Sequence, residues 1–174
     1  MSEADRFTSE EWRTLQLAPW WAFMAGTKAD MRVDVQKAAQ KVDAFLKEVR
    51  EAALYKERLV REVLTSIGFN PKGWVAAYEA DSRSILEGLT QVRTILDAKA
   101  DSTEAVLFKG ELMTFVDKGA RASGPIRKDE ESAALAVALL LGFNPKAYAR
   151  SGVAKRHRRP EMRQLLSAVG RYFR

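Results

Sequence analysis

Cysteine is absent from this sequence of 174 residues, and histidine occurs once, as His157. Without cysteine the chain can form neither a disulfide framework nor a thiolate site for zinc or an iron–sulfur cluster. A cysteine nucleophile is excluded for the same reason. The single histidine stands among arginines, which leaves no second imidazole for a metal pair or a proton relay. We therefore predict a protein without enzymatic activity and without a cofactor.

Long apolar runs are also missing. The run from Ala133 to Leu141 has nine residues, whereas a membrane-spanning helix needs about 20. The N-terminal residues Met-Ser-Glu-Ala-Asp-Arg-Phe are acidic and polar, and no apolar stretch follows them, so we expect neither a secretory signal nor a transit peptide. These features predict a cytoplasmic protein and make a membrane partner the weakest of the possible partners.

Acidic side chains are scarce near the C-terminus. Residues 146–174 contain nine lysines and arginines and one acid, Glu161, whereas the other 145 residues contain 20 basic and 22 acidic side chains. The net charge of +6 is therefore confined to the C-terminal end of the chain. This asymmetry points to a partner that carries negative charge.

Five adjacent basic residues, 155–159, form the centre of this charged region. Like charges repel one another, so such a run gains little unless an anionic group approaches it. The anion could be a nucleic acid held by its phosphates, an acidic protein or a membrane surface, or the run could be a solvated linker that pairs with the rest of the chain. The candidate anion-binding or partner-binding residues are Lys155, Arg156, Arg158, Arg159 and Arg163.

Glycine and proline are both absent between Asp34 and Ile67. Apolar residues in this stretch follow a spacing of four and three residues with one gap, at Lys56, which is typical of an amphipathic helix. A similar stripe runs through residues 71–98, with a gap at Ser82. We predict that the two stretches form long helices that pack as an antiparallel hairpin, because the connection between them is short.

Shorter helices are predicted around this pair. Thr8 begins a capping box, and Pro19 is expected to end the helix that starts there and to begin a second short one. Another capping box begins at Asp101. Residues 129–141 are apolar on nearly every side after the first turn, which predicts a helix at the centre of the bundle. An amphipathic helix is expected after Pro160.

No window of the sequence alternates apolar and polar residues in the manner of a half-buried strand. The sequence therefore predicts an all-α fold, a helical bundle of two long antiparallel helices plus several shorter helices. We divide the chain into a helical bundle domain, residues 1–154, and a basic segment, residues 155–174, which includes the last amphipathic helix.

The pentapeptide Gly-Phe-Asn-Pro-Lys occurs twice, at residues 68–72 and 142–146. Local chemistry explains it: glycine permits a left-handed conformation after a helix, phenylalanine packs back, asparagine caps the next helix and proline suits its first position. The two copies also suggest an internal duplication of two helical hairpins.

The turn at residues 122–130 reads Ala-Ser-Gly-Pro-Ile-Arg-Lys-Asp-Glu. Gly124, Ile126 and Glu130 match the family pattern Ala-Asp-Gly-x-Ile-Ser-x-x-Glu, and Ser123 replaces its aspartate. The segment from Phe115 to Tyr148, which contains this turn, resembles the second half of tellurite-resistance TerB-like domains. An earlier turn at residues 29–37 keeps the aspartate of the pattern, as Asp30, but lacks its glycine and glutamate, and the two stretches together cover about a third of the chain. The resemblance implies an all-helical bundle with approximate two-fold pseudosymmetry, and paired acidic turns that are associated with a divalent metal in that family.

The acidic residues of the two candidate turns are Asp30 and Asp34 in the first and Asp129 and Glu130 in the second. Hard cations such as calcium need six or more oxygen ligands, which neither turn supplies alone. Asp34 and Asp129 are equally explained as acids in the first turn of a helix, where they face its dipole. We predict no metal site, and whether the two turns converge is left open.

The function that follows is a non-enzymatic, TerB-like interaction or structural protein. It would bind a protein partner through the basic segment or through a helical face that carries tryptophan. The alternative is a nucleic-acid-associated protein that contacts phosphates without sequence specificity. The tryptophans are expected in the core or at an interface rather than around a ligand; they are Trp12, Trp20, Trp21 and Trp74.

Overall fold

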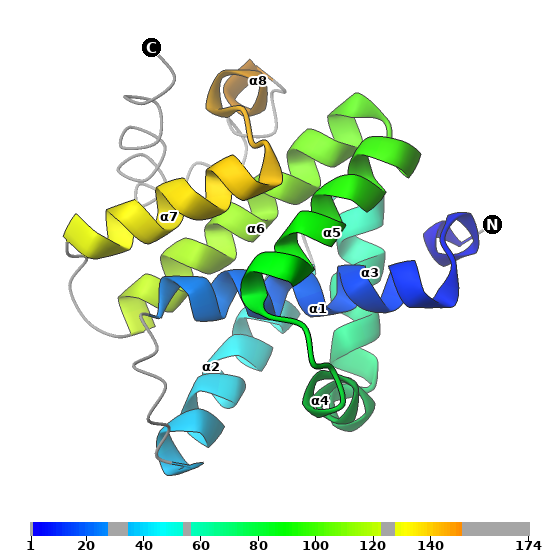
Figure 1. Ribbon diagram of the computed structural model, residues 1–174. Coiled ribbons are helices and arrows are strands. Elements are labelled where there is room, and N and C mark those ends of the chain that lie inside the picture. Colours follow the sequence, from blue (N-terminus) through cyan, green and yellow to red (C-terminus); the bar gives the residue numbers. More distant parts are fainter. Residues whose placement is uncertain (1, 28–34, 54–56, 123–127, 151–174) are drawn as a thin grey trace.

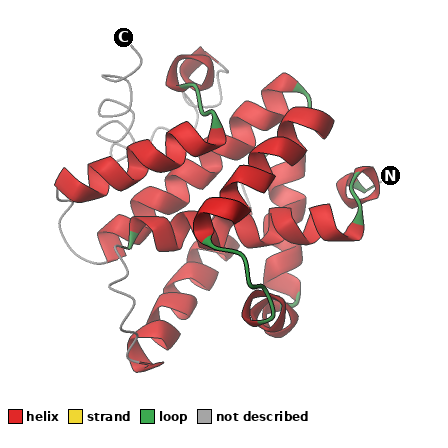
Figure 2. Ribbon diagram, in the orientation of Figure 1, coloured by secondary structure: helices red, strands yellow, loops and turns green. Residues whose placement is uncertain are grey.

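The computed structural model describes residues 2–27, 35–53, 57–122 and 128–150. These residues form one short 3-10 helix and eight α-helices and contain no strand (Figures 1 and 2). The all-α class predicted from the sequence is therefore confirmed. The elements are η1 (Glu3–Arg6), α1 (Ser9–Gly26), α2 (Val35–Ala53), α3 (Arg58–Phe69), α4 (Pro71–Glu79), α5 (Ile85–Lys99), α6 (Ser102–Ala122), α7 (Lys128–Leu141) and α8 (Pro145–Arg150).

Helices α1 and α6 cross at the centre of the bundle, where α1 meets α6 more extensively than any other helix (Figure 1). Glycine permits this close crossing. A Cβ atom on Gly26 would lie 2.0 Å from the Val116 carbonyl oxygen, and one on Gly119 would lie 1.9 Å from the Phe23 carbonyl oxygen. The two backbones therefore touch directly, and α3, α5, α7 and α8 pack around the pair.

The start of α1 follows the predicted capping box. The Thr8 hydroxyl accepts a hydrogen bond from the Glu11 amide, and the Glu11 carboxylate accepts one from the Thr8 amide. The predicted end of this helix at Pro19 is wrong, because α1 continues through Pro19 to Gly26. Proline removes one helical hydrogen bond, but both sides of this turn are buried, so packing against α5 and α6 outweighs the local preference.

The predicted pair of long helices is also wrong, since each of the two stretches contains two helices. Glu57 has an extended conformation (φ −55°, ψ 160°) just before α3, and Ser84 (φ −67°, ψ 161°) caps α5. The helix interruptions fall near the gaps in the apolar stripes, at Lys56 and Ser82. In place of one long hairpin, α2 packs against α3, and α5 packs against α1 and α7.

Helix α7 lies on the outside of the bundle, not at its centre as its composition predicts (Figure 1). Ala134, Val137 and Leu141 are buried on one side, whereas Ala136 and Leu139 are exposed on the other. Leu139 retains 54% of its accessible surface. One side of this helix therefore packs on the core and the other faces the solvent, although both sides carry apolar residues.

The order of elements repeats along the chain. The two pentapeptides stand 74 residues apart, and each lies between a longer helix and a short one, α3 and α4 in the first half and α7 and α8 in the second. Each half also begins with a capped helix, α1 or α5. This order agrees with the internal duplication suggested by the pentapeptides.

Candidate functional site

The residues predicted to bind a partner lie outside the described residues: Lys155, Arg156, Arg158, Arg159 and Arg163. Asp30 and Asp34 of the first acidic turn lie outside them as well. Asp129 and Glu130 belong to the first turn of α7, the position at which acids favour a helix dipole.

The tryptophans do not form an exposed face. Trp20, Trp21 and Trp74 are buried, and Trp12 is partly buried against the core. Trp20 lies 5.2 Å from Phe45 and 5.7 Å from Trp74 between ring centroids. The Trp74 indole nitrogen donates to the Gln16 carbonyl at 3.0 Å. The tryptophans are thus core residues that join α1, α2 and α4, and three of the four give a partner nothing to contact.

The two Gly-Phe-Asn-Pro-Lys copies have different structures. In the second copy, Gly142 has a positive φ of 58°, and Phe143 is 1% exposed. The Phe143 amide donates to the Ala138 carbonyl at 2.8 Å and the Gly142 amide to the Leu139 carbonyl at 3.1 Å, which is the Schellman motif. This copy follows the local chemistry expected from the sequence.

In the first copy α3 continues through Gly68 to Phe69, and Phe69 is 85% exposed. Only the second half of the motif keeps its expected role here. Asn70 accepts a hydrogen bond from the Gly73 amide at 3.0 Å, and Pro71 is the first residue of α4. Phe69 is the most exposed large apolar side chain among the described residues, so the prediction that this phenylalanine packs back onto the preceding helix is wrong.

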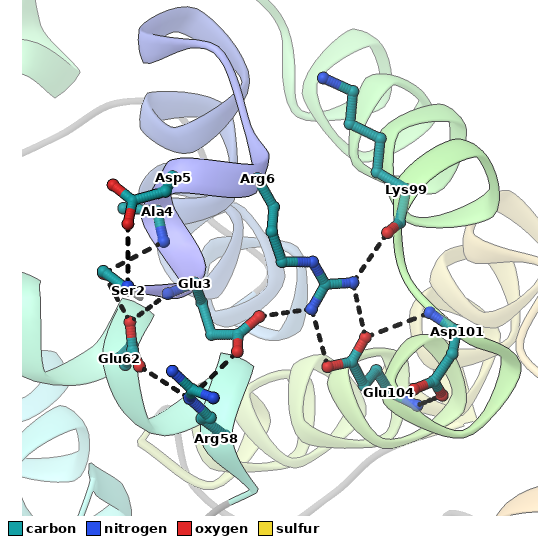
Figure 3. A network of polar contacts seen from close by, with 10 residues as sticks. All are labelled: Ser2, Glu3, Ala4, Asp5, Arg6, Arg58, Glu62, Lys99, Asp101 and Glu104. Carbon is teal, nitrogen blue, oxygen red and sulfur yellow. Dashed lines mark hydrogen bonds and ion pairs between the residues drawn. The ribbon is translucent and has the colours of Figure 1, made fainter.

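A network of polar contacts connects several charged groups at the N-terminus (Figure 3). The Arg6 guanidinium donates to Glu3, to both oxygens of Glu104 at 2.9 Å and to the Lys99 carbonyl at 2.8 Å. The hydrogen bond to Glu104 is the main cause that raises the pKa of Arg6, and the same bond lowers the pKa of Glu104. Glu3 is 5% exposed and also pairs with Arg58 of α3 at 3.1 Å.

The contacts of this network hold elements of the fold together. Its charges pair within the network: Glu62 accepts from the Ser2 hydroxyl at 2.8 Å and from the Glu3 amide at 2.7 Å. It fastens η1 to α3, to the end of α5 and to the start of α6 (Figure 3). We name it the N-terminal clasp.

A second ionic cluster surrounds Arg83, between α4 and α5. Arg83 pairs with Asp81, donates to the Thr14 hydroxyl at 2.8 Å and lies 5.1 Å above the Trp21 ring. The hydrogen bond from Arg83 is the largest cause that lowers the pKa of Asp81. Like the clasp, this cluster joins elements and presents no unpaired nucleophile or base.

Three charged residues are buried on α6: Lys109, Glu111 and Asp117. Lys109 donates to Asp97 at 2.6 Å. Asp117 accepts a hydrogen bond from Arg121 at its Oδ2 atom, at 2.9 Å, but its Oδ1 atom is buried without a hydrogen-bond partner in the described structure. Charged side chains this deeply buried were not predicted from the sequence.

The described part of the bundle contains a small cavity. A cavity of about 10 Å³ between α1, α3 and α6 is at the lower limit for one water molecule. Within the described ranges, no group of three His, Cys, Asp or Glu side chains could hold a metal ion. No helix in those ranges is long and apolar enough to cross a membrane.

Comparison with known proteins gives one informative relative. Over 138 residues the chain is 30% identical to a protein of Methanothermobacter thermautotrophicus described as the uncharacterized protein ORF11′. The aligned region covers 78% of this chain and 89% of that protein. No family model matches the chain, and no solved structure matches it.

Proposed function

The chain belongs to the family of the ORF11′ protein, and we propose that it is a non-catalytic helical interaction protein that binds an acidic protein partner through its basic segment. The residues that would contact the partner are Lys155, Arg156, Arg158, Arg159 and Arg163.

The observation that carries this proposal is the contrast in charge pairing between the bundle and the basic segment. Eight lysines and arginines of the bundle form ion pairs with acids of the bundle, and five of the eight pair with an acid on another element: the eight are Arg6, Arg58, Arg83, Arg93, Lys99, Lys109, Lys118 and Arg121. The basic segment has seven lysines and arginines and a single acid, Glu161. Most of its charge therefore has no acid within the segment to pair with.

The arrangement of the bundle supports a non-catalytic role. The polar side chains of the N-terminal clasp and of the Arg83 cluster are bonded to one another, and the tryptophans are used in the core. A reactive centre would need a nucleophile, base or metal ligand in an accessible pocket. The small cavity beside Glu111, among the described residues, is not such a pocket.

A nucleic-acid partner is the second candidate, because a run of five adjacent basic residues also fits a phosphate backbone. The two candidates differ in what the basic segment must recognise. Carboxylates on a polypeptide vary in spacing. The phosphates of a nucleic acid repeat at regular intervals, and their condensed counterions are released when a protein binds.

Binding assays on the full chain with two probes test the proposal. The probes are poly-L-glutamate and a short random-sequence duplex DNA, each titrated over a series of salt concentrations. The variant Arg156→Ala/Arg158→Ala/Arg159→Ala removes the centre of the run. The matched control, Lys47→Ala/Arg61→Ala/Lys72→Ala, removes three exposed basic side chains from α2, α3 and α4.

We expect poly-L-glutamate to bind the wild-type chain and the control equally, and the basic-segment variant at least about tenfold more weakly, since three charge pairs are lost. Tighter binding to DNA, with a salt slope shallower by up to about three in the basic-segment variant, would replace the protein partner by nucleic acid. If neither probe binds at low salt, the proposed function is wrong.

A further inference from the structure

Phe69 is a large apolar side chain that the fold leaves in water. It stands at the end of α3 with 85% of its surface exposed. The other two exposed large apolar side chains of the described residues, Leu86 and Leu139, keep 56% and 54% of theirs. Burial of an aromatic ring releases more free energy than burial of most other side chains. Of these three side chains, Phe69 therefore gains most from contact with a partner.

The surroundings of Phe69 come from three helices. A Cβ atom on Gly68 would have Arg50 Cγ of α2 as its nearest neighbour outside its own stretch of helix, at 4.0 Å. Lys72 follows Phe69 in the first turn of α4, and Arg61 lies about two turns before it on α3. In Figure 1, α4 and α7 lie on opposite sides of α1, so Leu139 of α7 belongs to a different surface.

The exposed charges of these three helices balance one another in number. Between residues 42 and 80, eight exposed charged side chains have no ion pair among the described residues, and each helix or its first flanking residue supplies as many acids as bases. The bases are Lys47, Arg50, Arg61 and Lys72, and the acids are Asp43, Glu51, Glu57 and Glu79. We call Phe69 and these eight residues the Phe69 face.

Such a surface fits a copy of itself better than it fits a polyanion. A phosphate backbone laid across it would meet an acid on every helix as well as a base, and like charges repel. Two copies related by a two-fold axis present the same patch to each other, so bases of one copy can face acids of the other. A residue near the axis meets its own counterpart, which gives an exposed ring an aromatic neighbour.

We propose that two copies of this chain associate through the Phe69 face, with the two Phe69 rings in contact near a two-fold axis and opposite charges paired around them. One large apolar side chain per copy makes a small interface, and small interfaces belong to weak, transient complexes. We therefore expect a dissociation constant on the order of 100 µM. This association does not depend on the proposed function.

Sedimentation of the full chain from about 1 µM to about 1 mM measures the association. Phe69→Ala should weaken it at least about tenfold, because one substitution removes both rings from the contact. Leu139→Ala, which shortens an exposed leucine on α7, is the matched control and should change nothing. Circular dichroism confirms that each variant is folded. A wild-type chain that remains monomeric at about 1 mM, or a dimer that Phe69→Ala does not weaken, would overturn the inference.

Thiol crosslinking locates the contact, because the natural chain has no cysteine. Gly68→Cys places a thiol beside Phe69 and keeps the ring, and the added Cβ atom has room. Ala136→Cys places one on the exposed side of α7. With a short bismaleimide reagent, we expect Gly68→Cys to crosslink between chains on the order of tenfold faster, and the added change Phe69→Ala to remove the difference. Faster crosslinking of Ala136→Cys would mean that copies meet through α7, and the inference would be wrong.

Charge exchange tests whether the face recognises itself. Arg50→Glu/Lys72→Glu makes the face acidic, and Glu51→Lys/Glu79→Lys makes it basic. Each variant alone should associate on the order of tenfold more weakly than the wild-type chain, because like charges now meet. An equimolar mixture of the two should form mixed dimers and recover most of the affinity. A mixture that associates no better than its components would refute the pairing of opposite charges across the axis.

A dimer would carry two basic segments, and this consequence rests on the proposed function. Two linked segments hold a long polyanion more tightly than one. At protein concentrations that favour the dimer, poly-L-glutamate should therefore bind Phe69→Ala severalfold more weakly than the wild-type chain. Equal binding would refute this consequence, and no binding by either would refute the proposed function, whereas sedimentation judges the dimer separately.

Discussion

Phe69 and Phe143 occupy the same place in two identical pentapeptides, yet one is exposed and the other is buried. The difference arises at the preceding glycine. Gly142 adopts a left-handed conformation that turns Phe143 back onto its own helix, whereas Gly68 remains helical and carries Phe69 outward. An aromatic residue is still buried near each junction: Trp74, two residues after the first copy, and Phe143 within the second.

This pair gives the first stability prediction. Phe143→Ala should lower the free energy of unfolding by about 3 to 5 kcal/mol, because it removes a fully buried ring and leaves a cavity. Phe69→Ala should change it by less than about 0.5 kcal/mol, because an exposed side chain loses few contacts. Urea unfolding of both variants measures the difference. Equal losses would mean that Phe69 is buried in solution, against another molecule or against the bundle.

The same two residues show what could be predicted from the sequence at this scale. The roles of Asn70, Asn144 and the prolines were predicted correctly, because a cap depends only on groups within three residues. The conformation of glycine was right in one copy and wrong in the other. Helical and left-handed glycine differ little in free energy, so contacts distant in sequence decide between them.

Helix α7 shows the corresponding limit at the scale of an element. Its existence was predictable, whereas its position was not, because from Ala133 onward the helix contains only alanine, leucine and valine and so has no polar side that would face the solvent. The prediction of two long helices was wrong for a different reason. The apolar stripes do mark helices, but the gaps in the stripes at Lys56 and Ser82 were assumed to lie inside continuous helices, whereas they lie close to helix ends.

The exposure of α7 leads to the second stability prediction. Leu139→Ala should cost less than about 1 kcal/mol, since just over half of this side chain is exposed. Leu141→Ala, two residues away on the buried side, should cost about 2 to 5 kcal/mol. Thermal and urea unfolding of the two variants provide the comparison. A large loss for Leu139→Ala would show that its outer side is covered in solution.

At the scale of the whole molecule, long-range ion pairs join helices whose sequences give no sign of their pairing. Arg6 and Glu104 are 98 residues apart, and Arg6 reaches Lys99 across 93 residues. Sequence patterns depend on neighbours along the chain, so they indicated which stretches are helical but not which helix ends meet. The candidate sites divide in the same way: the basic segment is evident from composition, whereas Phe69 becomes notable only once α3 is seen to continue through Gly68.

The N-terminal clasp predicts how the whole fold responds to acid. The pKa of Glu104 is lowered in the folded protein, first by the hydrogen bond from Arg6. Next to the clasp, the pKa of Glu11 is lowered, first by the hydrogen bond from the Lys99 ammonium group. A carboxylate with a depressed pKa binds protons more readily in the unfolded chain. Its contribution to stability is therefore complete above the unfolded pKa of about 4.3 and is lost as the pH falls through the lower folded value.

We expect the contribution of the clasp to the melting temperature to stay constant from about pH 7 to about pH 5.5 and to decrease below about pH 4.5. Glu104→Gln should lower the stability at neutral pH by about 1 kcal/mol, since Arg6 and Glu104 are partly open to solvent, and should flatten the acid slope. Glu79→Gln, which changes an exposed acid at the end of α4, is the control and should keep the wild-type slope. An acid slope that Glu104→Gln leaves unaltered would show that other carboxylates cause it, and that the clasp holds η1 by packing rather than by charge.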